Sequence, residues 1–196
     1  MKKYIGGIIG GLIILGIVVW VVFYTLNNRK DNSVYTNKKT SNTEAQALIS
    51  KDLDRFYPST PREVVKLYQR INVCLMTNSY TEEEYYSLVG QLRKLYDDEL
   101  LELNPEDKYT EILYDEIYLF KEAGKSIPIT NIQLESQAEK YTLNGKNMAS
   151  IVAMFVIKTK NSGIERSYEK FVLREDEKGN WKILGWDVTS PVEFPD

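Results

Sequence analysis

The spacing of apolar residues changes twice along the chain and divides it into three zones. Residues 4–26 are almost wholly apolar and carry no charged side chain. Residues 59–124 repeat apolar side chains three and four positions apart, which is the pattern of helices with one buried face. After Gly124 the repeat shortens to two, which is typical of strands. The order of elements predicts an α+β domain that follows an apolar segment.

The apolar segment predicts a transmembrane anchor helix. Its 23 residues are long enough as a helix to cross a hydrocarbon core of about 30 Å. Lys2 and Lys3 precede it, but the run is longer than a signal peptide requires and no A-x-A-like cleavage site follows. An uncleaved signal anchor would hold the rest of the chain outside the cytoplasm. Basic residues flank both ends in similar number, so the opposite orientation stays open.

Four glycines at the start of the anchor form two overlapping G-x-x-x-G patterns, Gly6 with Gly10 and Gly7 with Gly11. Such a stripe lets two membrane helices approach closely and would support a homodimer. The alternative is that glycine is simply common in membrane spans. The expected divisions of the chain are a tail (1–3), the transmembrane anchor (4–26), a polar tether with a possible short helix (27–58), the α+β domain (59–190) and a C-terminal tail (191–196).

Three helix starts are expected inside the domain. Thr60 precedes Pro61 and is followed three residues later by Glu63, which is a capping-box pattern. Thr81 and Glu84 repeat that pattern, and the apolar stripe after them runs through residues 81–101 as one helix. Asn104 before Pro105 predicts the start of the third helix.

Four antiparallel strands are expected after the helices. Residues 127–143, 148–160, 164–175 and 181–189 are apolar or alternate with period two, and turn residues separate them. Asn144-Gly145 predicts a tight hairpin. The second strand is apolar in both phases, which indicates cover on both faces of the sheet.

The last strand contains two tryptophans, Trp181 and Trp186, whose spacing places them on opposite faces if the alternation is regular. Trp186 shares its phase with Leu184 and Val188 and is assigned to the core. Trp181 and Ile183 share the other phase and are the candidate residues for contact with a partner or with a terminal segment.

Composition excludes several functions. The 196 residues include no histidine and one cysteine, Cys74, so histidine-based catalysis, a Cys/His zinc site and an internal disulfide are not available. Cys74 lies on an apolar helix face and is expected to be a buried hydrophobic residue. The net charge of −3 does not fit a nucleic-acid binder. The acidic runs lack the spacing of a calcium loop, so no metal or cofactor is expected.

The stretches "FYPSTPREVVKLYQRI", "LYDDELLELNP" and "GNWKILGW" make the chain similar to a family of uncharacterised, membrane-anchored proteins of Gram-positive bacteria. The element order resembles the nuclear transport factor 2-like cone. That resemblance implies three helices packed on a curved four-stranded antiparallel sheet, with dimerisation through the sheet in many relatives. It supplies no catalytic residues.

The function expected is that of a single-pass, membrane-anchored, non-catalytic extracytoplasmic domain in the cell envelope. It would act by protein interaction or scaffolding with an unknown envelope protein or with a second copy of the chain. The alternative is a small apolar ligand-binding or isomerase-like domain. There Tyr68 on the first helix and Asp187 on the last strand would act as in cone-fold isomerases that use tyrosine and carboxylate groups.

Overall fold

The structure of the chain, a computed structural model, describes residues 34–35, 43–160 and 163–194. Along these residues five helices come first and five strands follow. The helices are α2 (Glu44–Ile49), α3 (Pro61–Thr77), α4 (Glu82–Arg93), α5 (Asp98–Leu103) and α6 (Glu106–Glu122). The strands are β1 (Lys125–Ile132), β2 (Glu139–Leu143), β3 (Lys146–Thr159), β4 (Gly163–Glu175) and β5 (Trp181–Val188), and a 3-10 turn, Glu135–Gln137, separates β1 from β2.

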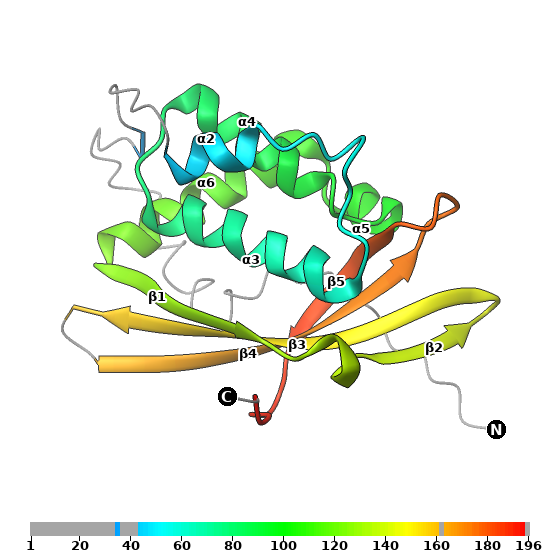
Figure 1. The fold of residues 1–196 in the computed structure, drawn as a ribbon. Helices are drawn as coiled ribbons and strands as arrows, with labels where there is room; N and C mark the ends of the chain where they lie inside the picture. Colours follow the sequence, from blue (N-terminus) through cyan, green and yellow to red (C-terminus); the bar gives the residue numbers. More distant parts are fainter. Residues whose placement is uncertain (1–33, 36–42, 161–162, 195–196) are drawn as a thin grey trace.

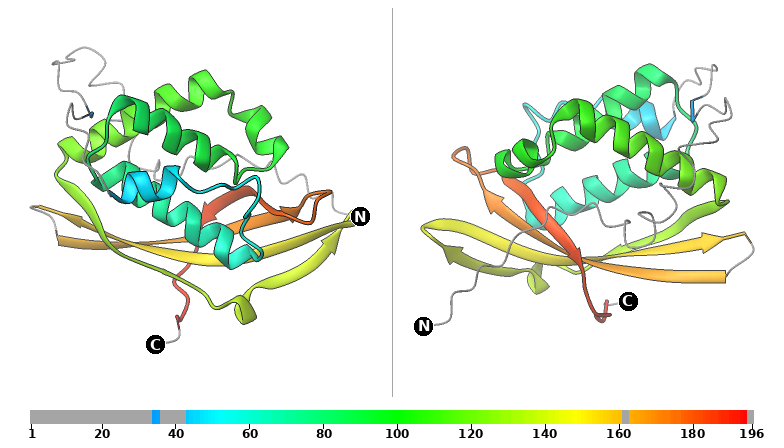
Figure 2. Two further views of the ribbon diagram at one scale, coloured as in Figure 1. Left: turned by 45° about the horizontal axis from the view of Figure 1, so that its top comes forward. Right: turned by 180° about the vertical axis from the view of Figure 1, so that it is seen from behind.

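The helices form a layer on one face of the sheet, and the C-terminal end of the chain lies on the other side (Figures 1 and 2). The predicted α+β class is present, but the prediction of three helices on a four-stranded sheet, made with the nuclear transport factor 2-like resemblance, is wrong in both counts. The short helix predicted within residues 27–58 is α2.

Two of the three predicted helix starts are confirmed. The Thr60 hydroxyl accepts a hydrogen bond from the backbone N–H of Glu63 at 3.2 Å, which caps α3. Thr81 caps α4 in the same way, and the Glu84 carboxylate accepts from the Thr81 N–H at 2.8 Å. That pair is a complete capping box. The Glu63 carboxylate instead accepts from the N–H of Ser59 at 3.0 Å.

The single helix predicted over residues 81–101 is wrong, because the chain divides it into α4 and α5. The segment between them lies along β5, where the Asp97 N–H donates to the Ile183 carbonyl and the Ile183 N–H donates to the Leu95 carbonyl, both at 2.8 Å. Asp97 then caps α5 by accepting from the N–H of Glu99. A long-range pairing with the last strand therefore overrides a continuous helical stripe.

Asn104 does not cap α6, so that prediction is also wrong. Pro105 occupies the N-cap position and makes no side-chain capping bond. The Asn104 amide donates instead to the Leu100 carbonyl at 2.9 Å, which satisfies the end of α5. The residue therefore ends one helix rather than starting the next.

The sheet is antiparallel, with β3 pairing β4, and β4 pairing β5. The other edge of β3 pairs with β1 along one half and with β2 along the other. The predicted first strand, residues 127–143, is thus two strands, because the turn at Glu135–Gln137 interrupts it. Asn144 and Gly145 both have positive φ, 52° and 76°, and form the predicted hairpin.

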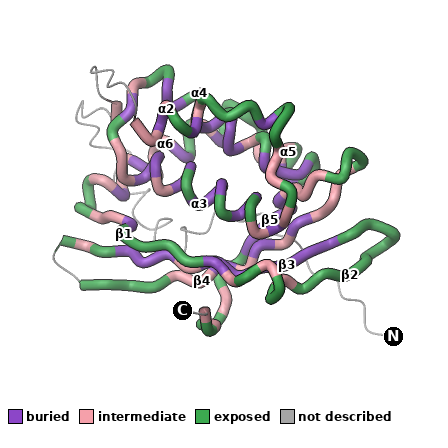
Figure 3. The backbone as a smooth tube through the Cα atoms, in the orientation of Figure 1, coloured by how far each residue is buried: buried purple, intermediate pink, exposed green. Residues whose placement is uncertain are grey.

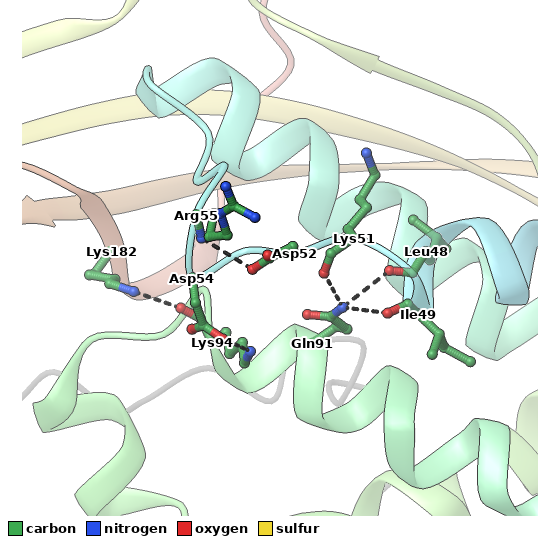
Figure 4. Close-up of polar contacts among 9 residues, drawn as sticks. All are labelled: Leu48, Ile49, Lys51, Asp52, Asp54, Arg55, Gln91, Lys94 and Lys182. Atoms are coloured by element: carbon green, nitrogen blue, oxygen red, sulfur yellow. Dashed lines mark hydrogen bonds and ion pairs between the residues drawn. The ribbon is translucent and has the colours of Figure 1, made fainter.

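The side-chain amide of Gln91, on α4, holds the C-terminal end of α2. Gln91 donates from Nε2 to the carbonyls of Leu48, Ile49 and Lys51 at 3.3, 2.9 and 2.7 Å (Figure 4). Leu48 and Ile49 end α2 and Lys51 lies just beyond it, so their carbonyls have no partner within the helix. The contact orders the chain that leads into α3, and no local sequence pattern indicates it.

The core lies between the helical layer and the inner face of the sheet (Figure 3). On β3 the inward residues Ile151, Phe155 and Ile157 belong to this core. The predicted transmembrane anchor, residues 4–26, lies outside the described residues. Within the described ranges, no helix combines the length and the apolar composition needed to span a bilayer.

Candidate functional site

The interior beneath α3 is filled by aromatic rings around Tyr68. The Tyr68 ring is 4% exposed, and its centroid lies 5.1 Å from that of Phe171 and 5.2 Å from that of Trp186. Behind it, the hydroxyls of Tyr96 and Tyr109 hydrogen bond to each other at 2.8 Å. Rings at these separations are in direct contact, so this part of the interior is closed.

Two carboxyl groups lie among these rings. Glu169 of β4 is 2% exposed, and its burial raises the pKa of the carboxyl to about 8. Burial likewise raises the pKa of Glu116, on α6, to about 7. Burial also raises the pKa of Tyr68, and the charges of Glu169 and Glu116 add to that shift. Both carboxyls therefore carry protons over part of the neutral range.

Polar atoms of this cluster lack hydrogen-bond partners in the described part of the chain. Oδ1 of Asn72, one turn after Tyr68, and Oε1 of Glu116 are buried without a partner. A protonated carboxyl in an apolar site can donate a hydrogen bond or transfer a proton near pH 7. The cluster is suited chemically to acid–base work or to holding a small polar group.

Tyr68 and Asp187, the pair suggested by the sequence, do not meet. Asp187 is exposed and lies opposite Lys170, on the sheet face that points away from the helices. Tyr68 lies on the inner face. The carboxylate that lies on the same side as Tyr68 is instead that of Glu169, the neighbour of Lys170 in sequence.

Trp181 and Trp186 lie on the same face, so the prediction that they lie on opposite faces is wrong. Leu173 is opposite Ile183 and Val172 is opposite Gly185, so Leu184 is an extra residue in β5. Such a bulge shifts the alternation by one. Trp186 is 8% exposed, which confirms its assignment to the core. Trp181 is half-buried against the same core.

Ile183, the second interaction candidate, is 0% exposed and belongs to the core. Its side chain has no surface to offer to a partner. The bulge is again the reason, because it places Ile183 with Trp186 on the inner face.

The outer face of the sheet exposes large apolar side chains. Pairing register places four on this face: Ile129 on β1, Tyr141 and Leu143 on β2, and Ile164 on β4. Their exposures are 57, 43, 54 and 64%, respectively. Among the described residues, no α-helix covers this face (Figures 1 and 2).

The C-terminal segment covers part of the outer face. The Phe194 ring stacks on Tyr168 of β4, with centroids 6.2 Å apart and planes 23° apart. The Thr189 N–H donates to the Tyr168 carbonyl at 2.8 Å, which directs the segment beneath the sheet. The four exposed apolar residues lie in two pairs on either side of this segment, Ile129 and Ile164 towards one end of β3 and Tyr141 and Leu143 towards the other.

The carboxylates at the interior were missed by sequence reasoning, although a signal was present. Glu169 is in phase with Phe171 and Leu173, so a charged residue occupies the apolar phase of its strand. Glu116 lies three residues after Leu113 and four before Phe120, on the apolar stripe of α6. A polar residue at a predicted core position marks such sites.

Cys74 is buried, with 1% exposure, as expected. Burial is the main cause that raises the pKa of its thiol to about 12, so it is not a reactive thiolate. No cluster of three or more acidic or cysteine side chains that could bind a metal occurs within residues 34–35, 43–160 and 163–194.

Comparison with known proteins gives one family. The family described as "Domain of unknown function (DUF6715)" matches residues 1–186. No curated protein matches the chain. Among solved structures, the intermembrane space region of chloroplast protein ARC6 is similar at 11% identity over 66% of this chain and 94% of that chain, with a TM-score of 0.34.

Proposed function

The chain belongs to the DUF6715 family, which has no assigned function, and we propose that it is a non-catalytic interaction domain that self-associates through the outer face of its sheet. The observation that carries this proposal is that four large apolar residues are exposed on that face, Ile129 and Ile164 towards one end of β3 and Tyr141 and Leu143 towards the other. Exposed apolar surface of this kind marks interaction sites in folded proteins. The closed aromatic interior around Tyr68 favours the same reading.

A second copy of the chain is the partner we propose. The G-x-x-x-G patterns of the apolar segment favour close approach of two such segments. If two chains associate through their apolar segments, their domains are held at a high effective concentration relative to each other. A small contact area between the domains is then enough to associate them. The proposal places residues 4–26 in the cell membrane as a single-pass anchor and the domain outside the cytoplasm. The Gram-positive source implied by the resemblance also stays a prediction.

The charge of the outer face determines how this association depends on salt. Lys158 and Arg166 are exposed on the face beside Ile164, and Lys146 lies beside Leu143. The exposed acidic side chains on this side are Asp187, Glu139 and, on the C-terminal segment, Glu193, and Glu139 pairs with Lys170 at 2.9 Å. The face is therefore weakly basic. Two such faces repel at low ionic strength, so salt should strengthen rather than weaken the dimer.

Photo-crosslinking of the full chain in membranes tests the proposal. A photoreactive amino acid at Ile164 should give an adduct of twice the chain mass. The same group at Leu103, which is equally exposed at 64% but lies on α5, should give little. An adduct of another mass at Ile164 would point to a different envelope protein. Equal adducts at the two positions would contradict the proposed surface.

A small-ligand or isomerase-like function is the second candidate, and it rests on the buried carboxyls. Glu116 and Glu169 have raised pKa values beside Tyr68, and perturbed groups of this kind gather at functional sites. The buried, unpartnered Oδ1 of Asn72 adds an acceptor. Burial of these polar groups lowers the stability of the fold, and a role in binding a ligand would explain why they are there.

Thermal stabilisation by an apolar ketone such as 1-tetralone tests the second candidate. A rise in the Tm of the full chain that disappears in Glu169→Gln would support an interior site. Equal shifts in the wild type and in Glu169→Gln would count against it. Glu177→Gln, in an exposed turn, is the matched control.

A further inference from the structure

A groove on the helical layer is lined by tyrosines and carboxylates. It lies between α4 and the first half of α6, with a volume of about 460 Å³. Its walls comprise four tyrosines and four acidic residues, with Thr110: Tyr35, Tyr85, Tyr86, Tyr114, Glu106, Asp107, Glu111 and Asp115. No lysine or arginine of the described residues lines it. We refer to it as the acidic tyrosine groove.

One residue that precedes the domain already lies in this groove. The Tyr35 ring contacts Tyr114 and Tyr85, with centroid separations of 5.2 and 5.6 Å. The backbone N–H of Val34 donates to the Tyr114 hydroxyl at 3.4 Å. Burial is the main cause that raises the pKa of Tyr35, as expected for a ring held between others. Residues 34–35 are thus attached to a surface far from them in sequence.

The charge of the surrounding sequence is complementary to the groove. Residues 27–42 contain four basic residues, Arg29, Lys30, Lys38 and Lys39, and one acidic residue. Lys38 and Lys39 are three and four residues from Tyr35, so their Cα atoms can lie no more than about 11–14 Å from it. Glu106, Asp107 and Glu111 are exposed and line the same groove as Tyr35.

We propose that the acidic tyrosine groove is the docking site of the chain's own basic segment, residues 27–42, with Tyr35 as its fixed point. The aromatic contacts hold the ring, and the carboxylates of α6 attract the neighbouring lysines. The inference goes beyond self-association through the sheet and does not depend on it, because the groove lies on the helical layer.

Docking would shorten the link between the apolar segment and the domain. From Leu26 to the first residue of α2 the chain has 18 steps and could extend over roughly 60 Å. A fixed point at Tyr35 leaves nine steps, or roughly 30 Å. The domain is then restricted in height and orientation over the end of the apolar segment. Release of the segment would double its reach.

Tryptic cleavage of the full chain after Lys38 and Lys39, followed by mass spectrometry, tests this proposal. The rate at which a docked segment is cleaved depends on the fraction of molecules in which the segment is released. Tyr35→Ala and the double variant Glu106→Gln/Glu111→Gln should each speed this cleavage about tenfold, if each removes most of the docking free energy. Glu177→Gln and Phe56→Ala, exposed residues outside the groove, should leave the rate unchanged.

Salt supplies a second readout. Raising NaCl to about 0.5 M should speed cleavage in the wild type, relative to a synthetic peptide of residues 27–42, and have little effect on the double variant. Equal rates in the wild type, Tyr35→Ala and the double variant would overturn the proposal. So would tight binding of that peptide to the wild-type groove, since the groove would then be open to a basic segment of another protein.

Discussion

Ile183 and Trp186 lie three residues apart on β5 and face the same side of the sheet. Their partners across the ladder are Leu173 and Phe171, which are two residues apart on β4. The extra residue, Leu184, is accommodated by a bulge. This relationship places both side chains under the helices, so the large exposed apolar residues of the outer face come from the other strands.

Trp186→Ala should unfold the domain or destabilise it by about 3–5 kcal/mol, because the ring fills the space between Tyr68 and Phe171. Trp181→Ala should cost less, roughly 1–2 kcal/mol, because this ring is only half-buried. Its carbonyl, which accepts from the Tyr57 hydroxyl, is retained. Urea denaturation of both variants is the measurement. Equal losses would show that the two rings are equally part of the core.

Glu169→Gln should change how stability depends on pH. The pKa of Glu169 is raised from 4.5 to about 8 in the folded chain. Between these values the folded state keeps a proton that the unfolded state releases. The free energy of unfolding therefore falls as pH rises through this window, by up to about 1.4 kcal/mol per unit, and is level outside it.

The glutamine variant lacks this slope and should be more stable than the wild type at pH 8, with a smaller difference at pH 5. Glu116→Gln should behave similarly over a window that ends near pH 7. Denaturation midpoints measured from pH 4 to 9 give the comparison. Parallel profiles for wild type and variant would mean that the Glu169 carboxyl is solvated.

Thr60→Ala should lower the free energy of unfolding by about 1 kcal/mol, because it removes the acceptor for the N–H of Glu63 at the start of α3. Thr142→Ala, at an exposed position of β2, is the matched control. Thermal melting of both variants is sufficient. An unchanged Tm for Thr60→Ala would place the start of the helix elsewhere.

The full chain should stay in the membrane fraction at high salt and at alkaline pH. Hydrophobic burial of residues 4–26 does not weaken when charge interactions are screened. Recovery of a soluble form that starts near residue 30 would instead show a cleaved signal peptide.

Orientation can be measured separately, by adding protease to intact protoplasts. Digestion of the domain is the result expected for a domain outside the cytoplasm. Full protection of the domain would reverse the orientation.

Local patterns predicted the elements whose stability is local. Thr60 and Thr81 begin helices as expected, and Asn144-Gly145 forms its turn, because each depends on residues within four positions. The break between α4 and α5 depends on Ile183, nearly ninety residues away, and could not be read locally. The contact that Gln91 of α4 makes beyond the end of α2 also joins residues distant in sequence, so it could not be read locally.

The candidate site was predicted only in part. Tyr68 was suggested by the resemblance to cone-fold isomerases, which use a tyrosine of the first helix, and it does lie in the interior. Asp187 directly follows the core residue Trp186, so alternation places it on the outer face, whereas Glu169, in the apolar phase of β4, was not considered. The outer apolar surface was expected from β3, but its exposed members come from β1, β2 and β4.

Sedimentation of the full chain in detergent, at several concentrations and two ionic strengths, tests self-association through the outer face most directly. We predict a dimer that tightens with salt. Ile164→Asp should raise its Kd about tenfold or more, while Leu103→Asp, equally exposed on α5, leaves it unchanged. A monomer at every concentration, or equal effects of the two substitutions, would contradict the proposed function.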